Sequence, residues 1–95
     1  MQEIMKHNII NDIELAEVAD QAFTDALQAF ESYDYLHAIQ HASTVMIISK
    51  NIEQRCAALM IFLNASSFVE NSSENPKKHH DTTDKIMDLI YYYDK

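Results

Sequence analysis

Apolar residues recur at steps of three and four along the first third of the chain, and polar residues fill the positions between them. The apolar positions are Leu15, Ala19, Ala22, Phe23, Ala26, Leu27, Phe30 and Tyr33. This spacing places them on one side of an amphipathic helix, which we predict over residues 12–32. Asn11 and Glu14 have the separation of a capping box, so we expect this helix to begin at Asn11.

The same periodicity returns after Asp34 and predicts a second helix over residues 35–49, with Asp34 as its N-cap. The predicted core stripe of this helix consists of Tyr35, Ala38, Ile39, Ala42, Val45 and Met46. Because the connection to the preceding helix is so short, we expect the two helices to fold back as an antiparallel hairpin.

A third helix is predicted over residues 52–70, with Asn51 as its N-cap, and it has two apolar stripes. One stripe contains Ile52, Cys56, Leu59, Met60 and Leu63. The other contains Ala57, Ala58, Ile61, Phe62, Ala65, Phe68 and Val69. A helix that is apolar on two sides is either central in its own domain or covered by a partner.

Residues 71–81 are polar, contain the single proline and predict an exposed loop. A shorter helix is expected over residues 82–93, ending in Tyr91, Tyr92 and Tyr93. Three consecutive aromatic residues cannot share one helix face, so at least one tyrosine should be exposed or lie at an interface. The predicted fold is all-α: three longer helices and a shorter C-terminal one, in antiparallel hairpins, forming a repeat-like array or an irregular four-helix bundle.

Composition supports a helical fold. The 95 residues include no glycine, which tight hairpins of strands use most, and we expect them to form one domain, 1–95. Cys56 is the only cysteine, so an intrachain disulfide is impossible, and we expect it to be buried as a small apolar residue. The chain shows neither the apolar run of a signal peptide nor one that spans a membrane, which favours a cytoplasmic protein.

Charge is distributed unevenly. The formal net charge is −8, and no Lys or Arg occurs between Lys6 and Lys50. Direct contact with a phosphate backbone requires cations, which argues against nucleic acid as a ligand. A basic protein is a better match for this acidic stretch.

Candidates for chemistry are weak in this sequence. His37 and His41 are four residues apart with Asp34 one turn earlier, a spacing that can hold a metal, but the helix pattern places them on the solvent side. A second set, His79, His80, Asp81 and Asp84, falls partly in the predicted loop. Cys56 lies in an apolar stripe with no neighbouring base, and a phosphate loop would need glycine. We therefore predict no catalytic residue, no metal and no cofactor.

Residues 22–45, AFTDALQAFESYDYLHAIQHASTV, resemble a tetratricopeptide repeat. In the resemblance Ala26 takes the small position of the first helix, Tyr35 the aromatic position after the turn, and Ala38 the key alanine of the second helix. Ala42 and Val45 take the later packing positions. The chain departs from the family pattern in lacking glycine at the small position and proline at the end. The family implies a protein-binding groove without chemistry, and the size and acidity are similar to those of the small chaperones of bacterial type III secretion systems.

The leading prediction is a non-catalytic chaperone or adaptor that shields an amphipathic helix of a partner. Its predicted binding residues are Ile61, Phe62, Ala65, Phe68, Val69, Tyr91 and Tyr92. The alternative is an acidic inhibitor, such as an immunity protein, an antitoxin or a nucleic-acid mimic, that neutralises a basic toxin or nuclease. Its recognition face would be Glu14, Glu17, Asp20, Asp25 and Glu31. A homodimer formed through the third helix is a further possibility.

Overall fold

The computed structural model describes residues 2–73 and 75–93, and within them the chain forms four α-helices and no strand. The helices are α1 Gln2–Glu31, α2 Tyr35–Ile48, α3 Ile52–Glu70 and α4 Pro76–Tyr93. The predicted all-α fold is therefore confirmed. No helix in this part of the chain has the length and apolar character needed to cross a membrane.

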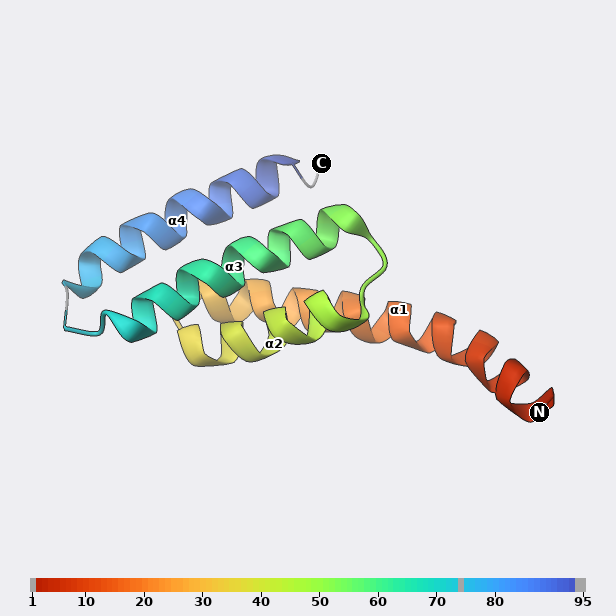
Figure 1. The fold of residues 1–95 in the computed structure, drawn as a ribbon. Helices are drawn as coiled ribbons and strands as arrows, with labels where there is room; N and C mark the ends of the chain where they lie inside the picture. Colours follow the sequence, from red (N-terminus) through yellow and green to blue (C-terminus); the bar gives the residue numbers. More distant parts are fainter. Residues whose placement is uncertain (1, 74, 94–95) are drawn as a thin grey trace.

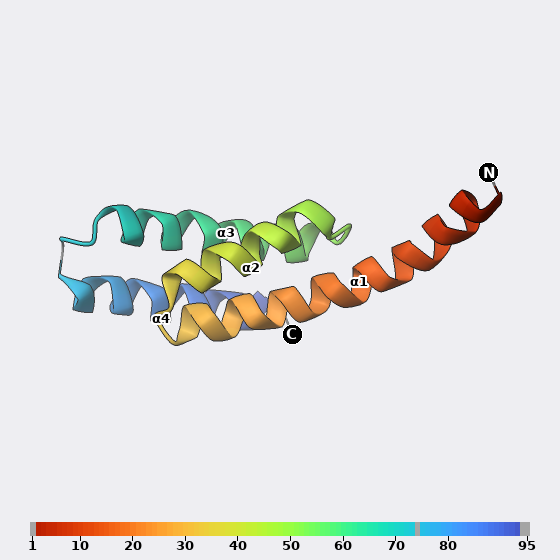
Figure 2. The ribbon, with the colours of Figure 1, turned by 90° about the horizontal axis from the view of Figure 1, so that it is seen from below.

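The helices form an irregular bundle in which consecutive helices run in opposite directions (Figures 1 and 2). Helix α2 packs closely against both α1 and α3, and α4 packs more loosely against α1 and α3. The N-terminal part of α1 projects beyond the other helices (Figure 1), which makes the molecule elongated, with extents of 56 × 28 × 17 Å. The closely packed part of the fold is thus α1–α2–α3.

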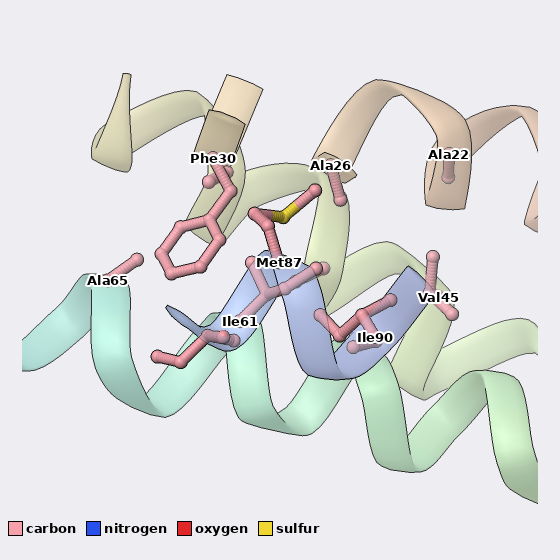
Figure 3. Packing of buried hydrophobic residues seen from close by; sticks show 12 residues of the cluster. Ala22, Ala26, Phe30, Val45, Ile61, Ala65, Met87 and Ile90 are labelled. Atoms are coloured by element: carbon pink, nitrogen blue, oxygen red, sulfur yellow. The ribbon is translucent and has the colours of Figure 1, made fainter. Parts of the chain in front are cut away.

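Alanines allow the first three helices to approach one another. Ala26, Ala38, Ala42, Ala58 and Ala65 have no exposed surface. Larger side chains from all four helices fill the space between them (Figure 3): Phe30 from α1, Val45 from α2, Ile61 from α3, and Ile86, Met87 and Ile90 from α4. The predicted core stripe of the second helix is confirmed, with Ala38, Ala42 and Val45 fully buried and the other three residues partly buried.

Two predicted N-caps are also confirmed. The Asp34 side chain accepts a hydrogen bond from the backbone N–H of His37, and the Asn51 side chain accepts one from that of Gln54. Between α1 and α2 the chain closes a Schellman motif, in which Asp34 N–H donates to Ala29 C=O and Tyr33 N–H donates to Phe30 C=O. These bonds satisfy carbonyls at the end of α1 and turn the chain back into α2.

Two predicted helix starts are wrong. Helix α1 is already formed at Gln2 and continues through Asn11, because residues 2–10 contain neither glycine nor proline to stop it. Helix α4 begins at Pro76 and not near residue 82, so the predicted loop 71–81 is shorter than expected. Proline is well suited to the first position of a helix, and the Asn75 side chain accepts a hydrogen bond from Lys77 N–H.

Candidate protein-binding groove

Helices α1 and α3 and the C-terminal end of α4 enclose an open groove of about 700 Å³. Helix α1 contributes Phe23 and Leu27, and α3 contributes Ala57 and Met60. Helix α4 contributes its last apolar residues, Leu89, Ile90 and Tyr93. Most of the lining is therefore apolar, and it comes from three separate helices.

The first half of α4 is fixed to the bundle by polar and aromatic contacts. The Tyr35 hydroxyl and Thr83 Oγ1 share a hydrogen bond of 3.0 Å, and Tyr33 donates one of 3.0 Å to Asp84 Oδ1. His80 stacks on Tyr33 with ring centroids 3.8 Å apart, and His79 stacks on Phe68 at 4.6 Å. The groove lies at the other end of α4, beyond these contacts.

One stripe of α3 is exposed beside the groove. Ile52 is 73% exposed, Leu63 57%, Leu59 42% and Met60 36%. Cys56 is also exposed, so the prediction of a buried thiol is wrong. Because Ile52, Cys56 and Met60 belong both to this stripe and to the groove lining, the groove and the stripe form one continuous apolar surface.

The predicted binding residues on α3 lie mostly in the core. Ile61 and Ala65 have no exposed surface, so their assignment to a binding surface is wrong. Phe62 and Phe68 are half-buried and pack against the core, and Val69 is 38% exposed. Helix periodicity defines two stripes on α3, and the docking of the other helices buries the stripe that we had assigned to a partner.

The C-terminal tyrosines have three different environments. Tyr91 is partly exposed, and its hydroxyl donates a 2.9 Å hydrogen bond to Glu31 Oε2, which joins α4 to the end of α1. Tyr92 is well exposed and packs edge-to-face on Tyr93, and only Tyr93 lines the groove. The exposure predicted for this segment is confirmed.

Sequence reasoning missed most of the groove. It assigned Phe23 and Leu27 to the core face of the first helix, and both are in fact partly buried beside the core while lining the groove. Met60 and Cys56 belong to the other α3 stripe, which contains none of the predicted binding residues. The second apolar stripe of α3 was the signal that could have identified the groove, because a helix that is apolar on two sides can bury one side in the core and leave the other exposed for binding.

The acidic residues of α1 do not share one environment. Glu14 and Glu17 are exposed, whereas Asp25 is half-buried and accepts a hydrogen bond of 3.0 Å from Gln21 Nε2. Asp20 lines the groove, and its Oδ1 accepts a 2.9 Å bond from Gln54 Nε2 on α3. Glu31 accepts the bond from Tyr91 described above.

The histidines are held in pairwise contacts. His37 Nδ1 lies 2.7 Å from Asp34 Oδ2, and the hydrogen bonds from His37 lower the pKa of the Asp34 carboxyl. The rings of His37 and His41 are 6.5 Å apart. Among the residues that the structure describes, no group of three or more His, Cys, Asp and Glu side chains is placed to hold a metal ion.

The groove thus combines a mostly apolar lining with a few polar and acidic residues. Its charged lining residues are Asp20 and Glu53, and none of the described lining residues is a Lys, Arg or His. Comparison with family models, with curated proteins and with solved structures found no match. The function is therefore inferred from the groove and its surroundings.

Proposed function

We propose that this protein binds an amphipathic helix of another protein along the groove between α1, α3 and α4 and covers its apolar face, as a non-catalytic chaperone or adaptor. The observation that carries the proposal is the continuity of the groove with the exposed stripe of α3. Contiguous exposed apolar surface of this kind marks sites where proteins interact. An elongated surface beside a groove suits a helix laid lengthwise.

The first hairpin supports this proposal. Ala26, Ala38 and Ala42, which the tetratricopeptide resemblance places at the small position, the key alanine and a later packing position, are all fully buried. The resemblance implies a helical scaffold whose role is binding. A chaperone like those of type III secretion systems, acting in the cytoplasm, is the form of this function that we favour, and an exposed thiol at Cys56 suits a reducing compartment.

The test uses fluorescently labelled helical peptides of about 18 residues, five turns, with leucines at i, i+3, i+4 and i+7. Binding is measured by fluorescence anisotropy for the wild type and for the double variant Met60→Glu, Leu63→Glu. Both residues are partly exposed on the stripe, so we expect the variant to keep its helicity and to bind at least about tenfold more weakly, since each leucine or methionine buried contributes on the order of 1.5–3 kcal/mol.

The matched control is Leu36→Glu, Ile47→Glu, which adds the same two charges to α2 at positions that are 62% and 79% exposed and do not line the groove. This variant should bind like the wild type. Equal affinity of the wild type and the double variant, or no binding of any leucine-striped peptide, would show that the groove is not a helix-binding site.

A further inference from the structure

We propose that the helix accepted by this groove carries Lys or Arg along one flank of its apolar face, and that Asp20 and Glu53 recognise those cations; this inference rests on the helix-binding function proposed above. The two carboxylates lie on separate helices, Asp20 on α1 and Glu53 in the first turn of α3, and both line the groove. A cationic flank is therefore met by charge on both helices.

The carboxylate of Asp20 is held in place at the groove. Its Oδ1 accepts a 2.9 Å hydrogen bond from Gln54 Nε2, and the Gln54 side chain also accepts a 2.6 Å bond from Ser49 Oγ. This chain of bonds runs from α1 to the α2–α3 connection, so Asp20 is oriented by groups that belong to the fold. Oriented charges recognise a ligand with a smaller loss of conformational freedom than mobile ones.

The remaining polar lining is uncharged and consists of Thr24, Asn51 and Gln54. A helix with carboxylates beside its apolar face would meet Asp20 and Glu53 with like charge. An apolar residue there would displace water from both carboxylates without replacing the hydrogen bonds that the water made. A Lys or Arg there offers both a hydrogen-bond donor and an opposite charge, and this attraction is screened less once the bound helix excludes water from the groove.

Glu53 also has a role within its own helix, because an acidic residue in the first turn interacts favourably with the helix dipole. Asp20 lies in the middle of α1, where the dipole offers no such explanation. The pair therefore needs a test in which the amide replaces the carboxylate, since Gln and Asn keep the shape and remove the charge.

A second copy of the chain fits this groove poorly. Between Lys6 and Lys50 the sequence has no Lys or Arg, so most of α1 and all of α2 would bring acidic or neutral surface to the two carboxylates. Helix α3 has one cation, Arg55, and two carboxylates, Glu53 and Glu70, so it would also bring net negative charge. Helix α4 carries Lys77, Lys78 and Lys85, but its apolar residues Ile86, Met87 and Ile90 are already buried. The two carboxylates of the groove therefore favour a cationic helix from a different protein.

The experiment compares two of the labelled peptides that share one leucine stripe, one with lysines and the other with glutamates at the flanking positions. With the wild type at about 50 mM NaCl we expect the lysine peptide to bind at least about tenfold more tightly, and this preference to shrink at about 500 mM NaCl. In the variant Asp20→Asn, Glu53→Gln the two peptides should bind within about threefold of each other. The control Glu14→Gln, Glu70→Gln removes the same amount of charge from exposed positions outside the groove lining and should keep the preference.

Each contrary outcome has its own meaning. Equal binding of both peptides to the wild type overturns the cationic-flank proposal and leaves the helix-binding function standing, whereas binding of neither peptide overturns the function itself. If the control variant loses the preference for the lysine peptide as fully as the groove variant does, the net charge of the protein causes the preference and Asp20 and Glu53 do not. Light scattering can also reveal a dimer of the wild type. If the substitution Met60→Glu dissociates that dimer, a second copy fills the groove and the proposal is overturned.

Discussion

Tyr33 adopts the left-handed backbone conformation, with φ of 65°, at the end of α1. Glycine is the usual residue at this position of a Schellman motif, because a Cβ atom is crowded there, and this chain contains no glycine. The side chain explains the choice of a tyrosine: its ring stacks on His80 and its hydroxyl donates to Asp84. One residue thus closes the α1–α2 turn and fixes the first half of α4.

The bond to Asp84 also makes Tyr33 sensitive to alkaline pH. It is the main cause of a raised pKa of the Tyr33 hydroxyl, with smaller contributions from burial and from nearby acidic groups. A raised pKa means that folding favours the neutral phenol, so the stabilisation is present below the ordinary value of about 10 and is lost as the pH rises above it.

We therefore expect the melting temperature of the wild type to fall more steeply above about pH 10 than that of Tyr33→Phe, measured by circular dichroism. Tyr35, whose burial raises its pKa, is present in both proteins, so the difference between the two curves reports Tyr33. Parallel curves would mean that the bond to Asp84 contributes nothing to stability.

At the level of the helices, α2 packs closely against α1 and α3, and α4 packs more loosely against the same two helices. Ala38 and Ala42 have no exposed surface because neighbouring helices occupy the space that larger side chains would need. Replacing such an alanine by a larger residue forces the helices apart. The groove lies beside this more loosely packed helix.

This packing predicts the effect of Ala38→Leu. We expect it to lower the free energy of unfolding by about 1–3 kcal/mol in urea titrations, since the added methyl groups cannot be accommodated. Gln40→Leu adds a leucine to an exposed position of the same helix and should change stability by no more than about 0.5 kcal/mol. A similar effect of the two substitutions would contradict the close approach of α2 to its neighbours.

The whole molecule carries a net charge of −8 on a small, elongated bundle, so its carboxylates repel one another. The acidic-inhibitor hypothesis would use this charge directly, through Glu14, Glu17, Asp20, Asp25 and Glu31. The structure divides these residues between open solvent, the groove and contacts with other side chains. Inhibitor binding should slow steeply in its association rate as salt rises, whereas most of the affinity of a groove is apolar and insensitive to salt.

Salt should also stabilise the free protein. Raising NaCl from about 20 to about 300 mM screens the repulsion between carboxylates, and we expect the melting temperature to rise by about 2–8 °C. The variant Glu14→Gln, Glu17→Gln has less repulsion to screen and should show a smaller rise. A melting temperature that falls with added salt would mean that attractive ion pairs outweigh the repulsion.

Local features of the chain could be predicted from the amino-acid sequence, because they depend on neighbours one or two turns away. The spacing of apolar residues, the absence of glycine and the caps Asp34 and Asn51 determined that the chain is helical and where α2 and α3 begin. Even at this level competing signals misled the prediction at both outer helices. The residues before Asn11 continue the helix past a capping signal, and Pro76 begins a helix where proline was read as part of a loop.

The candidate site was decided by tertiary structure. Periodicity places Ile61 and Leu63 on different stripes of α3 with equal apolar character, and nothing within the helix says which stripe is covered. The docking of α1, α2 and α4 buries Ile61 and leaves Leu63 exposed, and it brings Phe23, Met60 and Tyr93 to one groove from three helices. Contacts between residues far apart in the chain depend on how whole helices pack, so the sequence by itself determined the helices and the fold determined the surface.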